Sequence, residues 1–227
     1  MTLTEEKYSH YSLVKEMMDT VLMVLDFDPK CAADVTESVR RTGRLFISGE
    51  GSSRIMPAKN ARRRAMSLGL ALNVQCDGAR QAMEYDLSGY TVLINSNSGR
   101  TKEALALAKK LKAEGHKEVF SLSANPDTPL EHECAHGHVL KCGWEKAVAA
   151  TKSVVEQGLF CESIIWDLAG EKFSSALYGF RDDVLTALNT PIDPQIVEWV
   201  KGAHTIYFSG LNDGVAEELT LKTNEIT

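Results

Sequence analysis

The segment YTVLINSNSG, at residues 90–99, decides the fold of this chain. Its first five residues are apolar, aromatic or β-branched, which predicts a buried strand, and the Ser, Asn and Gly residues that follow predict a loop. A helix is expected next, over residues 101–114, because Leu105, Ala108 and Leu111 recur at helical spacing. A strand, a small polar loop and a helix in this order form the repeating unit of an α/β fold.

The same unit repeats along the chain. The loop GEGSS, at residues 49–53, also follows an apolar run and precedes a helix, which is expected over residues 57–68. Further strands are expected at residues 45–48, 70–74, 119–122 and 136–141. Strands that alternate with helices of about ten to fifteen residues predict a parallel sheet covered on both faces. We therefore expect an α/β protein with a three-layer α/β/α arrangement around a doubly wound parallel sheet.

Helices dominate both ends of the chain. Two helical stretches precede the first strand, and two long helices are expected over residues 147–168 and 171–188. After two prolines in the linker, a short helix, a strand at residues 205–209 and a glycine-bearing loop indicate a further unit. The expected parts are N-terminal helices (1–43), a central domain (44–190) and a second unit (191–227) that stops inside its first crossover helix.

Composition narrows the class of protein. The 227 residues are 44% hydrophobic and 25% charged, as in an ordinary globular protein, and the net charge of −6 disfavours binding to nucleic acid. The basic run at residues 62–64 falls in a helical pattern and predicts a solvated helix face. No run approaches the ~18 apolar residues of a membrane span, and the first residues lack the features of a signal peptide. We expect a cytoplasmic protein without a membrane partner.

Five cysteines are spread without the spacing of a disulfide framework, and reduced thiols are expected. His132, Cys134, His136, His138 and Cys142 fall within a short stretch, but their order lacks the paired spacing that zinc sites use. The alternation around the histidines suits an edge strand instead. We expect neither a metal nor a cofactor.

Two loops made of Gly and Ser carry the functional signal. Each follows a strand and precedes a helix, so that hydroxyls and free helix N–H groups can donate to an anion. Helix capping alone would explain one such loop, whereas two parallel loops favour a ligand. Arg54 stands where a dinucleotide loop needs its third glycine, and no G-K-[ST] follows residues 49–53. Nicotinamide cofactors and nucleoside triphosphates are therefore disfavoured.

Three motifs resemble those of the SIS (sugar isomerase) family. SNSGRT at residues 96–101 resembles the S-x-S-G-x-T phosphate loop, and GSS at residues 51–53 resembles the G-[ST]-S loop. EKAVAATK at residues 145–152 resembles the E-x-x-V-A-S-T-K segment of the double-SIS subfamily that includes glucosamine-6-phosphate synthase, with Ala150 in place of serine. Residues 210–226 are similar to the start of the second SIS unit in that subfamily. The resemblance implies a flavodoxin-like SIS domain.

The resemblance also implies roles for individual residues. Glu145 would be the base that moves a proton between C1 and C2 of the sugar, which suits a carboxylate. Taken alone, Glu145 would be interpreted as a surface carboxylate at a helix start, and the flanking VAATK at residues 148–152 reverses that preference. The residues expected to bind the phosphosugar are Gly51, Ser52, Ser53, Ser96, Asn97, Ser98 and Thr101.

This sequence departs from the subfamily in several places. Glu50 stands at a position that is uncharged in the synthase, where it could contact an amine of the substrate or cap a turn. His204 and Lys222 do not match the subfamily's ring-opening histidine and its lysine, so neither receives a role. No segment resembles a glutamine-hydrolysing domain, so glutamine-dependent synthesis is not expected.

Two classes of function remain open at this stage. The first is a phosphosugar isomerase, or a related deaminase or deglycase of amino-sugar phosphates. The second is a sensor that binds a sugar phosphate without turnover, and a nucleotide-binding flavodoxin-like protein ranks third. The long helices carry more apolar positions than one sheet face needs, so a homodimer or higher homo-oligomer is expected. The sequence does not specify which sugar phosphate is bound.

Overall fold

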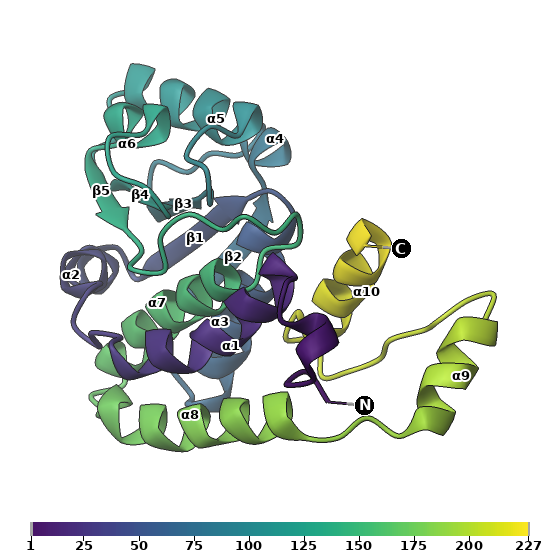
Figure 1. Ribbon diagram of the computed structural model, residues 1–227. Coiled ribbons are helices and arrows are strands. Elements are labelled where there is room, and N and C mark those ends of the chain that lie inside the picture. Colours follow the sequence, from purple (N-terminus) through teal and green to yellow (C-terminus); the bar gives the residue numbers. More distant parts are fainter. Residues whose placement is uncertain (1, 227) are drawn as a thin grey trace.

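The computed structural model describes residues 2–226, and its centre is a five-stranded, all-parallel sheet (Figure 1). The strands are β1 (Arg44–Gly49), β2 (Asn73–Gly78), β3 (Thr91–Asn95), β4 (Val119–Ser123) and β5 (His136–Val139). Their order in the sheet is β2-β1-β3-β4-β5. The order reverses between β1 and β3, which makes the carboxyl ends of these two strands the topological switch point. The predicted doubly wound α/β fold is confirmed.

Helices cover both faces of this sheet. The helices are η1 (Glu6–Tyr8), α1 (Ser12–Leu25), α2 (Ala33–Thr42), η2 (Gly51–Ser53), α3 (Ile55–Ser67), α4 (Ala79–Ala82), α5 (Lys102–Ala113), α6 (Pro129–Glu133), α7 (Lys152–Leu168), α8 (Phe173–Asn189), α9 (Pro194–Gly202) and α10 (Val215–Ile226). Side chains of α2, α3 and α7 share one apolar core with the sheet, and those of α4, α5 and α6 share another. The three-layer arrangement is therefore also confirmed.

Alternation along the strands explains the two cores. In β1, Leu45 and Ile47 lie in the core under α3 and α7, whereas Phe46 lies in the core under α5. Successive side chains of a strand point to opposite faces, so a strand covered on both faces must be apolar throughout. All five residues of β3 and of β4 are buried, as this arrangement requires.

The helices after α7 leave the sheet. Helix α8 packs against α1 and α7 through Phe173 and Leu177, its only buried residues, and runs below them in Figure 1. Helix α9 has no buried residue among those that the structure describes and lies apart from the sheet. Helix α10 returns to the first turn of α3. Gly214 has φ +93°, and a Cβ there would lie 2.6 Å from the carbonyl oxygen of Ile55, so a glycine permits this close approach.

One strand expected from the sequence does not form, and two expected elements begin at other residues. Residues 205–209, which the structure describes, do not form the expected strand. No described strand pairs with them, and Tyr207 is 90% exposed. The helix expected from residue 147 begins at Lys152, because the preceding residues form a loop around a buried carboxylate. The strand expected at residues 70–74 is β2, which starts three residues later, after Leu70 and Leu72 have packed against the core.

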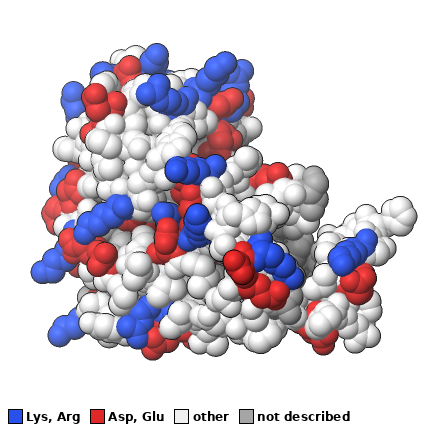
Figure 2. Space-filling view, viewed as in Figure 1, with Lys and Arg blue, Asp and Glu red and all other residues white. Residues whose placement is uncertain are grey.

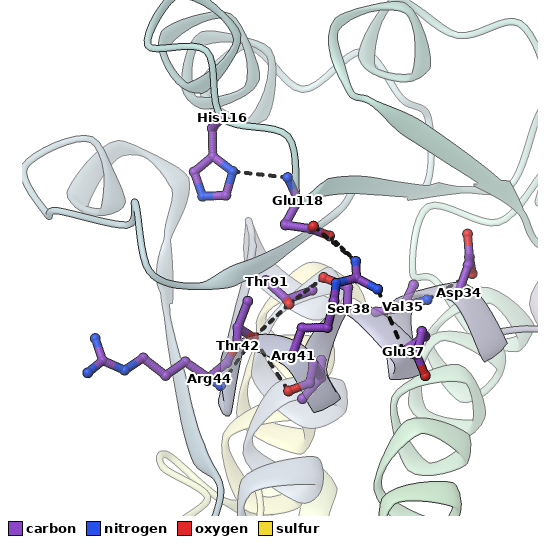
Figure 3. A network of polar contacts seen from close by, with 11 residues as sticks. Asp34, Val35, Glu37, Ser38, Arg41, Thr42, Arg44, Thr91, His116 and Glu118 are labelled. Atoms are coloured by element: carbon purple, nitrogen blue, oxygen red, sulfur yellow. Dashed lines mark hydrogen bonds and ion pairs between the residues drawn. The ribbon is translucent and has the colours of Figure 1, made fainter.

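A polar network joins α2 to the amino-terminal end of the sheet, opposite the switch point (Figure 3). The guanidinium of Arg41 donates to both carboxylate oxygens of Glu118, at 2.9 and 3.0 Å. The hydroxyls of Ser38 and Thr91 lie 2.6 Å apart. The hydrogen bond from Ser38, followed by that from Arg41, lowers the pKa of the Glu118 carboxyl below its ordinary value. This network attaches α2 to the first residue of β3 and to Glu118, directly before β4.

Charges are mixed over the surface. In Figure 2, basic and acidic side chains alternate across the visible face and do not gather into one basic area. Within residues 2–226, no helix is both long enough and apolar enough to cross a bilayer.

Candidate functional site

The two Gly/Ser loops meet at the topological switch point. Strand β1 ends at Gly49 and β3 ends at Asn95, and a Cβ at Gly49 would lie 2.6 Å from the carbonyl oxygen of Asn95. The Asn95 side-chain amide donates to the carbonyl oxygen of Ser53 at 3.0 Å, which ties the first loop to the second strand. In open α/β sheets, ligands bind in the crevice outside the carboxyl ends of the strands at this point. We call this region, formed by residues 50–54 and 96–101, the mouth.

The loop at residues 96–101 is held tightly in shape. The hydroxyls of Ser96 and Thr101 lie 2.8 Å apart, and Ser96 is only 1% exposed. Gly99 has φ +62°, and a Cβ there would come within 2.6 Å of the Thr128 side chain, so no larger residue fits without rearrangement. The amide of Arg100 donates to Ser98 Oγ at 3.2 Å. The buried hydroxyl of Ser96 therefore helps to fix the shape of the loop through its contact with Thr101.

Asn97, Ser98 and Thr101 of the same loop are half-buried. Helix α5 begins directly after Thr101, and its N-terminus has no capping hydrogen bond from a described side chain. The first amides of a helix lack partners inside the helix and point outward along its axis. These donors are available to a ligand in the mouth.

The first loop presents a second set of donors. Gly51 has φ +53° and opens η2, which places Ser52 and Ser53 directly before α3. The N-terminus of α3 also lacks a side-chain cap within residues 2–226. Two helix N-termini therefore converge on the mouth, and their dipoles favour a negatively charged group there.

Glu145 lies beside the mouth, in the loop before α7. It is 6% exposed. One carboxylate oxygen accepts from the amide and hydroxyl of Thr151, at 2.8 and 2.7 Å. The other accepts from the amide and hydroxyl of Ser153 and from the side-chain amide of Asn97, the last at 3.4 Å. Glu145 thus caps α7 and connects it to the loop at residues 96–101, and its bonds explain why the helix starts at residue 152.

Glu50 also acts as a cap in this structure. Its carboxylate accepts from the amide of Ala79 at 2.9 Å, at the start of α4. Of the two interpretations that the sequence left open for Glu50, the structure shows the capping contact.

Lys222 is a site residue that the sequence analysis set aside. Its ammonium donates to Ser52 Oγ at 2.7 Å and to the Glu225 carboxylate at 2.9 Å. Because α10 packs on the start of α3, this lysine brings a positive charge to the mouth from 170 residues further along the chain. No sequence motif near Lys222 signals that contact.

Gln157 of α7 is the second residue that the sequence analysis missed. It is 1% exposed, and its side-chain nitrogen lies 3.5 Å from Ser53 Oγ. The side-chain oxygens of Gln157, Asn95 and Asn97 are buried and accept no hydrogen bond from any described residue. Buried polar atoms without partners are uncommon in folded proteins, and here they border the mouth. In the sequence, the signal for Gln157 was a polar amide among the residues that form the buried face of α7.

None of the histidines and cysteines belongs to the mouth. Within residues 2–226, no group of three His, Cys, Asp or Glu side chains gathers closely enough to hold a metal ion. His138 packs against Phe120 and Phe160, and burial lowers its pKa. All five cysteines are free, and burial raises the pKa of the Cys161 thiol to about 12.

Comparisons with known proteins identify the family of this chain and several relatives. Residues 38–166 match the SIS domain family. The 3-hexulose-6-phosphate isomerase of Mycobacterium gastri is 31% identical over 123 residues, which cover 54% of this chain and 58% of that protein.

Two solved structures share the fold. One is a protein provisionally described as a phosphosugar isomerase from Silicibacter pomeroyi DSS-3, with a TM-score of 0.76, 22% identity and coverage of 92% of this chain and 66% of that one. The other is the C-terminal domain of the glucosamine-fructose-6-phosphate aminotransferase from Francisella tularensis, with a TM-score of 0.73, 19% identity and coverage of 98% and 69%. The chain thus spans between about three fifths and two thirds of the length of these proteins.

Proposed function

Since the chain belongs to the SIS domain family, we propose that it binds a sugar phosphate in the mouth, with the phosphate between η2 and residues 96–101. The observation that carries this proposal is the convergence of two uncapped helix N-termini on one crevice, beside the Lys222 ammonium. Phosphate needs several hydrogen-bond donors and positive potential, and the mouth supplies both. The unpartnered side-chain oxygens of Asn97 and Gln157 are suited to accept from sugar hydroxyls.

Within this site, we propose different tasks for the predicted residues. The hydroxyls of Ser53, Ser98 and Thr101 would donate to the phosphate, together with the amide of Ser52 and the first amides of α5, since the amides of Ser53 and Arg54 already donate within η2. Ser52 would hold Lys222 in place through the 2.7 Å hydrogen bond. The buried Ser96 would support the loop from behind, and Asn97 would align Glu145 with the sugar.

The reaction that we propose is proton transfer between adjacent carbons of the sugar, as in a phosphosugar isomerase. Such a reaction needs a carboxylate near C1 and C2, and Glu145 is our first candidate for this base. Its oxygens are occupied by donors from Thr151, Ser153 and Asn97, so one of these donors must give way when Glu145 takes up a proton. Glu225 is the second candidate, because its more exposed carboxylate pairs with Lys222 at the same mouth.

The occupied carboxylate of Glu145 also favours a second candidate function. A protein that only senses a sugar phosphate needs the capping role of Glu145 but no mobile proton. The phosphate site is common to both functions, and they differ only in turnover.

Solvent-deuterium exchange into C1 and C2 of hexose 6-phosphates distinguishes these possibilities. If Glu145 is the base, Glu145→Gln lowers exchange by about 10²- to 10⁴-fold, while the dissociation constant of the sugar phosphate changes little. Glu225→Gln, measured in parallel, is the matched variant. If exchange is undiminished in Glu145→Gln but lost in Glu225→Gln, the base is Glu225 and not Glu145. Binding without exchange by the unaltered chain would leave the sensor function.

We also propose self-association as a homodimer or higher oligomer, a cytoplasmic location, and the division of the chain at residues 43 and 190. Support for self-association comes from apolar side chains on α8 and α9 that remain exposed, including Tyr178 at 67% and Trp199 at 65%. Large exposed apolar areas are uncommon on monomers. Light scattering at micromolar concentration should give at least twice the 25.0 kDa mass of one chain. A single species of one chain would contradict self-association.

A further inference from the structure

The segment that carries Glu145 has no regular secondary structure of its own. Residues 140–151 connect β5 to α7, and none of them lies in a helix or a strand. Backbone amides in such a segment cannot pair with one another as they do in helices and sheets, so they need other partners. The contacts that fix this segment therefore decide where the Glu145 carboxylate lies. We call residues 140–151 the Glu145 loop.

Glu156 of α7 holds the start of the Glu145 loop. This residue is 3% exposed, and its two carboxylate oxygens accept from the amides of Lys141 and Cys142, at 2.8 and 2.7 Å. The amide of Leu140 donates to the carbonyl oxygen of Ser123, at the end of β4, at 2.8 Å. The loop therefore leaves the sheet in a fixed direction.

Glu16 of α1 holds the middle of the Glu145 loop from a distant part of the chain. Glu16 is 6% exposed, and its carboxylate oxygens accept from the amides of Lys146 at 2.6 Å and of Ala147 at 3.3 Å. These two residues directly follow Glu145 in the sequence. The loop is thus held by one buried carboxylate at its start and by another next to Glu145.

Apolar contacts attach helix α1 to the domain independently of Glu16. Helix α1 packs on α7 and α8 (Figure 1), where Met23 and Val24 lie in one apolar cluster with Leu159 and Phe173. A buried carboxylate loses its hydration and contributes little net stability even when it is paired. Its charge does strengthen hydrogen bonds from backbone amides, and two such bonds fix the direction of a loop. The place of Glu16 therefore indicates a role in the geometry of the Glu145 loop.

The contacts of Glu16 act directly on Glu145. Consecutive Cα atoms lie ~3.8 Å apart across a peptide bond, so a shift of Lys146 moves Glu145 with it. The Glu145 carboxylate accepts from the amide of Thr151 at 2.8 Å and from the side-chain amide of Asn97 at 3.4 Å. Asn97 belongs to the mouth. The chain of contacts thus runs from Glu16 through the loop backbone and Glu145 to the mouth.

We propose that Glu16 is a positioning residue, which holds the Glu145 loop so that the Glu145 carboxylate meets the mouth. It acts through the backbone amides of Lys146 and Ala147, and not by contact with the ligand. The inference rests on the proposed function, in which Glu145 is the first candidate for the base. It adds α1 to the parts of the chain on which that chemistry depends.

Hydrogen exchange of the backbone amides, followed by NMR, tests this role without any ligand. In Glu16→Gln, an NH₂ group replaces one acceptor oxygen, so the amides of Lys146 and Ala147 cannot both keep their hydrogen bonds. At least one of them should exchange about tenfold faster, because a hydrogen bond to a charged acceptor is lost. The amide of Thr151, which donates to Glu145, should exchange faster as well, because the loop shifts.

The chain offers an internal control and a matched variant. The amides of Lys141 and Cys142 are bound by Glu156, so Glu16→Gln should leave their exchange rates unchanged. Asp26→Asn alters an exposed carboxylate at the end of α1 and should leave the rates of the whole loop unchanged. If Glu16→Gln does not fold, Glu16→Asp takes its place. It keeps the charge but is one methylene shorter, and it should accelerate exchange at the same amides.

Turnover gives a second readout. Where Glu145→Gln lowers deuterium exchange into the sugar phosphate, Glu16→Gln should lower its kcat by about ten- to hundredfold, because a shift of about 1 Å in a reacting group can cost about 10²-fold. The dissociation constant of the sugar phosphate should stay nearly the same, because the two loops of the mouth are held by other contacts. A general loss of structure would instead lower the Tm, kcat and affinity together.

The outcomes separate this inference from the proposed function. If the unaltered chain binds no sugar phosphate, or binds it without exchange, the proposed reaction fails, and the amide of Thr151 alone decides whether Glu16 positions Glu145. An unchanged exchange rate of the Thr151 amide in folded Glu16→Gln would overturn the inference. Equal losses of kcat and affinity would also overturn it, as would an undiminished kcat in a chain that Glu145→Gln inactivates.

Discussion

The ammonium of Lys222 is shared among a serine of the mouth and two carboxylates of its own helix. Its contact with Ser52, at 2.7 Å, is the shortest of these. A ligand phosphate near Ser52 would offer Lys222 a doubly charged partner in place of a neutral hydroxyl. At the scale of single residues, we therefore propose Lys222 as a source of positive charge for the phosphate of the ligand.

Lys222→Met should weaken the binding of a hexose 6-phosphate by about ten- to hundredfold, since hydrogen bonds to charged groups contribute about 1.5–3 kcal/mol. Lys222→Arg should retain most of the affinity, because it keeps the charge. Lys201→Met is the control, as this lysine of α9 pairs with Glu198 on the surface, away from the mouth. Calorimetry would contradict the assignment if Lys222→Met and Lys201→Met bound the sugar phosphate equally well.

At the scale of elements, α2 depends on the network at the amino-terminal end of the sheet (Figure 3). The pKa of Glu118 is lowered by its hydrogen bonds to Ser38 and Arg41. A carboxyl group whose pKa is lowered by folding stabilises the folded state above its unfolded pKa. That stabilisation is lost as the pH falls through the lower, folded pKa.

We therefore expect Glu118→Gln to lower the Tm at pH 7. The difference in Tm from the unaltered chain should begin to shrink below about pH 4.5, where the unfolded carboxyl group takes up its proton. Glu171→Gln, which alters an exposed glutamate before α8, is the control and should leave the Tm at pH 7 almost unchanged. A difference between Glu118→Gln and the unaltered chain that stayed constant down to pH 3 would argue against the network.

Elements whose signal is local could be predicted from the sequence. Strand β3 and its loop follow from an apolar run that ends in Ser, Asn and Gly, and the parallel sheet then places the two Gly/Ser loops at the same edge. The strand expected at residues 205–209 failed because a strand requires a partner, which an apolar run cannot guarantee. The contact of Lys222 with the mouth could not be predicted either, because it depends on a partner far away in the sequence. The packing of α10 on α3 requires contacts such as that of Gly214 with Ile55.

At the scale of the whole molecule, the site draws on distant parts of the chain. The loops of β1 and β3 supply the donors, α7 supplies Gln157 and the cap around Glu145, and α10 supplies Lys222. Helix α10 thus completes the mouth, although α9, which precedes it in the chain, has no buried residue among those that the structure describes. The central claim is that these parts form one site for a sugar phosphate.

Titration of the ¹⁵N-labelled protein with fructose 6-phosphate, followed by amide chemical shifts, tests this claim most directly. We expect the largest shifts on the amides of residues 51–54 and 98–103, with a second group around Lys222 in α10. Fructose without the phosphate should cause almost none of these shifts, and Ser98→Ala should require a higher concentration of the sugar phosphate. Shifts that cluster elsewhere, or that fructose reproduces equally well, would contradict a phosphate site at the mouth.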